Sequence, residues 1–301
     1  MKIMLKLIAP LAVILAAMPA AAALNVFACE PEWGALAQEL GGDKVSVHSA
    51  TTALQDPHRI EARPSLIARV RNADLIVCTG SDLEAGWLPL LLAQAGNAKV
   101  QPGSTGFLEA SQFVAKIEIP KVVDRSQGDI HPGGNPHIHL DPRNIARVAD
   151  ALSERLRRID PPNAEVYRTR SASFQERWRA ALQRWEQQAV RLKGMPIVVY
   201  HRDMSYLINW LELHEAGSLE PRPGIPPTPS QLAELVQRMQ REPAKAVVYS
   251  AYNDSRAAQF LSERARIPAL MLPYTVGGTA AAKDIFGLFE DTLTRLLSVA
   301  K

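Results

Sequence analysis

The chain has 301 residues, of which 22% are charged and 47% hydrophobic, and its formal net charge at pH 7 is +3. This near balance of charge gives no electrostatic basis for binding nucleic acid, so we expect no nucleic-acid partner. The length is sufficient for two α/β domains or for one large domain.

The first 23 residues are typical of a secretory signal peptide. Lys2 and Lys6 precede an apolar run over 7–17, and three consecutive alanines then supply a small-residue cleavage site. The apolar run is shorter than the roughly 20 residues that a membrane-spanning helix needs. No cysteine stands at the junction, so a lipid anchor is not expected. We predict cleavage before Leu24 and export of a soluble protein.

The chain that follows alternates short apolar runs with amphipathic segments. This alternation predicts βαβ units, in which helices flank a parallel sheet. The expected strands cover 24–28, 44–48 and 74–78, and the expected helices cover 32–40, a segment that begins near Pro64, and 82–95. Residues 102–136 are rich in glycine, proline and polar residues and are expected to be irregular, and a helix over 142–158 follows.

The two cysteines each belong to the end of an expected strand. Cys29 directly follows the strand over 24–28, and Cys78 ends the strand over 74–78. If these strands are parallel neighbours, the two sulfurs lie at the same edge of the sheet, and an oxidising compartment favours a disulfide. Buried free thiols are the alternative, and the separation of the Cα atoms distinguishes the two cases.

A long helix is predicted over 163–193. This segment contains no proline or glycine, and Gly194 can end the helix. Its apolar residues recur at steps of three and four on one helical face, namely Phe174, Trp178, Leu182, Trp185, Ala189 and Leu192. The βα alternation then resumes with strands over 196–200, 244–249 and 269–272 and helices over 205–211, 230–241, 254–266 and 284–299.

Together these elements predict an α/β protein with two lobes, each a parallel sheet flanked by helices, joined by one long rigid helix. The expected parts are a signal peptide over 1–23, an N-terminal α/β lobe over 24–162, a linking helix over 163–193 and a C-terminal α/β lobe over 194–301. A coiled coil is the alternative use of the long helix, but a single short amphipathic stretch more commonly packs on a core.

Three histidines stand where an extended run gives way to a loop. His58 and His137 each follow a proline, and His201 ends an expected strand. Proline fixes φ, so a Pro-His step directs the imidazole with little conformational freedom left to lose. A metal site needs several ligands that a rigid frame directs at one point. We therefore predict a metal site, with three unrelated loop histidines as the alternative.

Four short motifs occur in order around the long helix. They are Asp56-Pro57-His58, Asn72-Ala73-Asp74-Leu75-Ile76-Val77, Asn135-Pro136-His137-Ile138-His139-Leu140-Asp141-Pro142 and Tyr200-His201-Arg202-Asp203. In this arrangement the chain resembles the metal-binding receptor proteins of bacterial ABC importers, the family of periplasmic zinc-binding and manganese-binding proteins. The resemblance implies a periplasmic, monomeric receptor that is not an enzyme. It also implies an inner-membrane ABC permease as partner, and a periplasmic zinc chaperone is a further candidate.

The resemblance also implies a set of metal ligands. His58, His137 and His201 match the three nitrogen-ligand positions of the family, and Asp284 matches an acidic position at the start of the last helix. Stabilisation of that helix N-terminus is the alternative role of Asp284. Three imidazoles and one carboxylate form a tetrahedral site suited to Zn(II). Relatives that prefer manganese carry a carboxylate where His201 stands, so zinc is expected and a manganese or iron receptor is the alternative.

The remaining candidates have supporting roles. His139 is expected to be structural or to support the ligands, and Glu61 to orient His58 or to lie on the surface. His131 lies in a short loop where many zinc-specific relatives carry a long His-rich loop, and a transient role in passing zinc to the site is our hypothesis. The sequence contains no His-Glu-x-x-His motif, nucleophile elbow or P-loop. An exported metallohydrolase and an adhesin or interaction protein are the alternatives from other classes.

Overall fold

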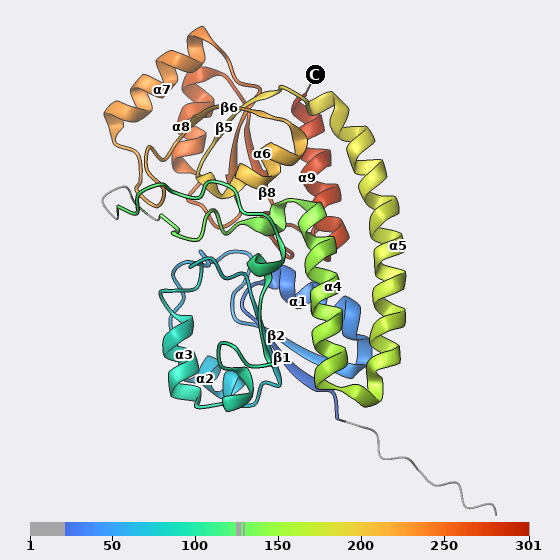
Figure 1. Cartoon of the computed structure of the whole chain (residues 1–301). Helices are drawn as coiled ribbons and strands as arrows, with labels where there is room; N and C mark the ends of the chain where they lie inside the picture. Colours follow the sequence, from blue (N-terminus) through green and yellow to red (C-terminus); the bar gives the residue numbers. More distant parts are fainter. Residues whose placement is uncertain (1–21, 125–127, 129, 301) are drawn as a thin grey trace, which may run out of the picture.

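The computed structural model describes residues 22–124, 128 and 130–300, so nearly all of the predicted signal peptide lies outside the described residues. Within this part of the chain two four-stranded sheets lie at opposite ends of the molecule (Figure 1). The first sheet has the order β2-β1-β3-β4 and is parallel throughout. Its strands are β1 (Leu24–Ala28), β2 (Val45–Ser49), β3 (Leu75–Cys78) and β4 (Phe107–Glu109).

The helices of this lobe are α1 (Pro31–Gly41), α2 (Pro64–Arg71), α3 (Leu88–Ala95) and α4 (Pro142–Ile159), and each has a proline in its first two positions. Alternate strand residues face opposite sides of the sheet. Phe27 and Ile76 pack with α2 and α3, whereas Val26 and Leu75 pack with α1, α4 and the long helix. Both faces of the sheet are therefore covered.

The second sheet has the order β6-β5-β7-β8 and is also parallel. Its strands are β5 (Pro196–Val199), β6 (His214–Ser218), β7 (Ala246–Ser250) and β8 (Ala269–Leu272). The helices are α6 (Ser205–Leu211), α7 (Pro229–Arg241), α8 (Arg256–Ala265) and α9 (Ile285–Val299). The buried residues of α7 and α8 cover one face of this sheet, and those of α6 and α9 cover the other.

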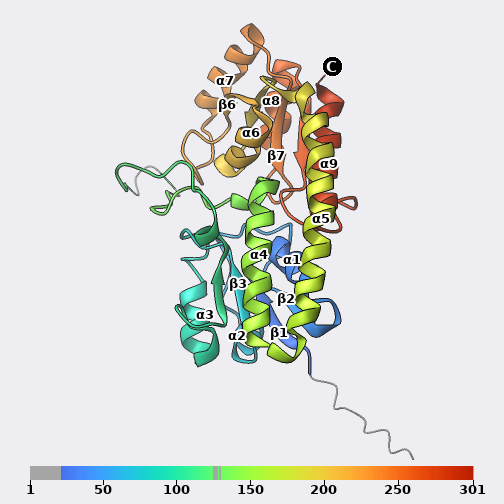
Figure 2. The ribbon, with the colours of Figure 1, turned by 45° about the vertical axis from the view of Figure 1, so that its right-hand side comes forward.

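The long helix α5 (Ala164–Ala189) runs beside both lobes, with α4 alongside it (Figures 1 and 2). Turns of 3-10 helix precede and follow it, which accounts for the longer segment expected from the sequence. The rings of Trp178 and Trp185 lie 5.5 and 5.3 Å from that of Phe289 on α9. One hydrophobic cluster therefore continues from the first lobe into the second. The predicted α/β fold with two sheets is confirmed, while the domain boundaries stay a prediction.

Two differences from the sequence expectation concern the first lobe. The helix expected over 82–95 begins only at Leu88, because Ser81 and Asp82 adopt positive φ and the chain turns before the helix starts. Strand β4 was not expected, since it lies in the stretch rich in glycine and proline. Of the helices in the described part, none is both long enough and apolar enough to cross a membrane.

Cys29 and Cys78 form a disulfide with a Cα–Cα distance of 4.8 Å. The parallel register pairs Ala28 with Val77, so the next residue on each strand is a cysteine. The predicted pairing is thus confirmed, and it follows from the adjacency of β1 and β3, the two central strands, whose carboxyl ends lie side by side.

Candidate metal centre

The three predicted histidines come together between the lobes. His58 lies in the loop after β2, His137 precedes α4, and His201 follows β5. Each of these side chains offers one ring nitrogen that could bind a metal, and these nitrogens all lie within 4.8 Å of one another. His137 and His201 are 1% and 7% exposed, and His58 is partly buried. Imidazoles from distant parts of the chain thus face one small volume.

Each of the three imidazoles is held by a polar partner at Nδ1. These contacts are His58 Nδ1 to Asp56 Oδ1 at 2.7 Å, His201 Nδ1 to Glu220 Oε2 at 2.7 Å, and His137 Nδ1 to the Tyr274 hydroxyl at 2.8 Å. The carboxylates at Nδ1 of His58 and His201 fix the ring orientation and the tautomer. The Tyr274 hydroxyl fixes the ring orientation of His137. In each ring this leaves Nε2 for a metal. The described residues therefore include three oriented imidazoles that could hold a metal ion.

The two Pro-His motifs form the same local turn. The carboxylate of Asp56 accepts the backbone N–H of His58 at 3.0 Å, and the amide oxygen of Asn135 accepts that of His137 at 3.0 Å. A short polar side chain that bonds the backbone two residues later is characteristic of an Asx turn. Asn135 also donates to the carbonyl of Arg202 at 2.9 Å, which links the His137 loop to the loop of His201.

The electrostatic environment differs between the two buried histidines, His137 and His201. Burial holds the pKa of His137 well below its ordinary value, and the neighbouring imidazoles lower it further. Burial also lowers the pKa of His201, but the hydrogen bond that His201 Nδ1 donates to Glu220 and the negative charges of Asp203 and Glu220 outweigh it, so the net pKa is raised. His137 therefore stays neutral to a lower pH than an ordinary histidine, and His201 takes up a proton at a higher pH than an ordinary histidine does.

Comparison with known proteins identifies the family. The model of the family described as "Zinc-uptake complex component A periplasmic", ZnuA, matches residues 26–299. The chain belongs to this family.

Relatives of the ZnuA family that resemble this chain differ in the metal that they are named for. The chain is 24% identical to the high-affinity zinc uptake system protein ZnuA of Paracoccus denitrificans, over 92% of this chain and 91% of the relative. It is 23% identical to the manganese ABC transporter substrate-binding lipoprotein PsaA of Streptococcus pneumoniae, over 80% of this chain and 76% of the relative. A crystal structure of ZnuA shares the fold, with a TM-score of 0.77, 20% identity, and coverage of 92% of this chain and 98% of that one.

Asp284, the acidic ligand expected from the resemblance to the ZnuA family, does not join the histidines. It is exposed, and its Oδ1 accepts the backbone N–H of Gly287 at 2.8 Å, which caps the N-terminus of α9. Among the described residues the cluster around the histidines contains no carboxylate ligand. The loop after β8 instead directs Tyr274, near its start, to His137, while Asp284 lies at the far end of that loop. Asp284 therefore caps α9 outside the histidine cluster, and its role as the fourth ligand stays a prediction.

The other candidates occupy different places. His139 is fully buried, and its Nε2 donates to the carbonyl of Tyr274 at 3.0 Å while its Nδ1 lies 3.3 Å from Glu32. It therefore ties the two lobes together as a structural residue. Glu61 is exposed, and Asp56 rather than Glu61 orients His58. His131 lies next to the cluster, with its ring centroid 5.2 Å from that of His58.

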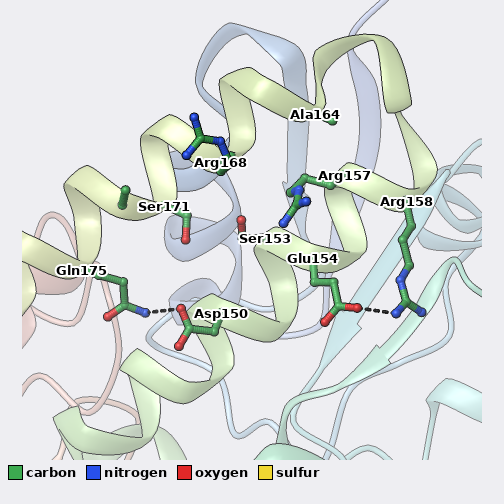
Figure 3. Close-up of a pocket in the computed structure, with 10 residues that line it drawn as sticks. Asp150, Ser153, Glu154, Arg157, Arg158, Ala164, Arg168, Ser171 and Gln175 are labelled. Carbon is green, nitrogen blue, oxygen red and sulfur yellow. Dashed lines mark hydrogen bonds and ion pairs between the residues drawn. The ribbon is translucent and has the colours of Figure 1, made fainter.

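Two cavities of the described part are lined by different kinds of side chain. A cavity of about 530 Å³ adjoins the cluster and is bordered by His131, His137 and His201. A groove of about 600 Å³ lies elsewhere, between α4 and α5 (Figure 3). Three arginines and no histidine are among the described residues that line this groove. The full lining is Asp150, Ser153, Glu154, Arg157, Arg158, Ala164, Arg168, Ser171, Ala172 and Gln175. The groove therefore does not suit a metal cation, and the histidine cluster is the candidate site.

Proposed function

We propose that this protein is a periplasmic receptor that captures Zn(II) with His58, His137 and His201 and delivers it to an inner-membrane ABC permease. The observation that carries the proposal is the convergence of three imidazoles, each supported at Nδ1. Membership of the ZnuA family supports the role of receptor rather than enzyme. In this proposal the protein acts as a monomer, and a periplasmic chaperone is a candidate source of the metal.

The donor set is our argument for zinc over manganese. Imidazole nitrogen suits zinc, whereas manganese prefers carboxylate, carbonyl and water oxygens. The cluster offers three nitrogens, and its carboxylates Asp56 and Glu220 contact the imidazoles rather than standing as ligands. Similarity to relatives does not decide the metal, because these are named for zinc and for manganese.

A competition experiment tests this proposal. The metal-free protein is exposed to equal, limiting Zn(II), Mn(II) and Fe(II), desalted, and analysed for bound metal. We expect one zinc per chain, lost in His58→Ala. His214→Ala is the matched control, because His214 is an exposed histidine on β6. Bound manganese or iron would overturn the choice of metal, and no bound metal would overturn the receptor function.

Zinc affinity is expected to depend on pH through His201. A histidine ligates only when neutral, and the pKa of His201 is raised. Protons therefore begin to compete with zinc at a higher pH than for an ordinary histidine, and affinity falls as pH decreases through that pKa. One competing proton lowers affinity about tenfold per pH unit. Chelator competition between pH 8 and 5 measures this.

Glu220→Gln is the control for this pH dependence. The substitution removes the negative charge that raises the pKa of His201, so the loss of affinity should begin at a lower pH. Equal zinc affinity at pH 7.5 and pH 5 would contradict the assignment of the histidines as ligands.

A further inference from the structure

We propose that His131 is the fourth zinc ligand, so that four imidazoles form the inner shell. This inference rests on the proposed function and concerns the same site. The Nε2 atom of His131 lies 3.2 Å from Nε2 of His58. Its ring centroid lies 5.2 Å from that of His58 and 6.4 Å from that of His137. His131 thus stands beside Nε2 of His58. Among the described residues the nitrogens that all lie within 4.8 Å of one another are those of His58, His137 and His201, so in this proposal His131 moves closer to the other two when zinc binds.

The separation of the two nitrogens is that of two ligands on one ion. Zinc binds histidine nitrogen at about 2.0–2.1 Å, and two such nitrogens in a tetrahedron lie about 3.3 Å apart. The observed 3.2 Å between His58 and His131 agrees with this spacing. The two Nε2 atoms therefore already have the separation of two ligands on one tetrahedral zinc ion.

The backbone holds His131 near the cluster. The N–H of Gly134 donates to the carbonyl of His131 at 3.0 Å, which closes a four-residue turn with Pro132 and Gly133 at its centre. Proline and glycine are favoured in such turns, and Gly134 has a φ of +94°. The next residue, Asn135, belongs to the turn that positions His137. The two histidines are thus presented by consecutive turns.

The hydrogen positions define how zinc would replace the contact between the rings. Asp56 accepts the proton on Nδ1 of His58, so Nε2 of His58 carries a lone pair. In the metal-free contact Nε2 of His131 therefore donates its proton to that lone pair. When zinc binds, the proton on Nε2 of His131 passes to solvent and Nδ1 of the same ring takes one up, so the imidazole stays neutral. Both rings then turn from the hydrogen bond so that their Nε2 lone pairs point to the ion.

Charge balance supports an inner shell without a carboxylate. Four neutral imidazoles leave the two positive charges of zinc uncompensated. Asp56 and Glu220 supply two negative charges, each one hydrogen bond away from a ligand. Carboxylates hydrogen-bonded to ligating histidines stabilise the metal without occupying its coordination sphere. Such a shell contains no hard oxygen donor from the protein, which adds to the discrimination against Mn(II).

X-ray absorption at the zinc edge, with chelator competition, tests the role of His131. We expect four imidazoles in the unsubstituted protein, and three with one water oxygen in His131→Ala. Zinc affinity should fall at least tenfold in His131→Ala and remain unchanged in His214→Ala. Circular dichroism checks that each variant is folded.

The failures of the two proposals are distinguishable. One bound zinc with three imidazoles in the unsubstituted protein, and an unchanged affinity in His131→Ala, would overturn the role of His131 but leave the receptor function intact. No bound zinc in any variant would overturn the receptor function itself.

Discussion

His137→Ala is expected to lower the affinity for zinc by more than about a hundredfold while the protein remains folded. Loss of a group that only supports a ligand typically costs 10- to 100-fold, and loss of the ligand itself costs more. His137 is the most enclosed of the three histidines, at 1% exposure, so its imidazole is held in place by packing as well as by Tyr274. Competition with a chelator of known affinity at pH 7.5 measures the change.

Tyr274→Phe provides a graded control for that experiment. It keeps the ligand and the aromatic ring but removes the hydroxyl that lies 2.8 Å from Nδ1 of His137. We expect a loss of about 10- to 100-fold, smaller than that of His137→Ala. An affinity of His137→Ala within tenfold of the unsubstituted protein would show that His137 is not a ligand.

Much of the site was predictable because its signals are local. Asp56-Pro57-His58 and Asn135-Pro136-His137 each contain the histidine and the side chain that fixes its turn. The partners of the imidazoles are different. Tyr274 is 137 residues from His137, and Glu220 is 19 residues from His201, so only the folded chain brings them into contact.

The fourth position shows the same limit. Asp284 has a local signal, a carboxylate before a helix, but that signal equally describes an N-cap, which is the role that the structure shows. The position of His131 beside His58 depends on contacts 73 residues apart. No spacing rule in the sequence could choose between these two residues.

The strands divide in a similar way. Apolar runs such as 75–78 and 196–199 are buried on both faces and were predicted, because their hydrophobicity alone indicates a parallel sheet. Strand β6 was missed, since His214, Glu215 and Gly217 have low strand propensity. It lies at the edge of its sheet and forms through pairing with β5, which is a tertiary effect.

Removal of the disulfide, by joint Cys29→Ala and Cys78→Ala, is expected to reduce the free energy of unfolding by about 4 kcal/mol. The two cysteines are 49 residues apart, and closing a loop of that length lowers the entropy of the unfolded chain by this order. Both side chains are fully buried, so alanine introduces no unpaired polar group. Urea unfolding of the metal-free proteins measures the difference.

Zinc affinity of the same double variant separates two roles of the bond. The carbonyl of Cys29 accepts a hydrogen bond from Thr51 at 3.0 Å, in the segment that leads to His58, but neither cysteine belongs to the histidine cluster. If the disulfide only joins β1 to β3, stability falls while zinc affinity stays within about threefold, since the turn at Asp56 holds His58 independently. A loss of affinity comparable to that of Tyr274→Phe would mean instead that the disulfide, by joining the carboxyl ends of β1 and β3, positions His58. A loss of stability below about 1 kcal/mol would contradict the loop-closure argument.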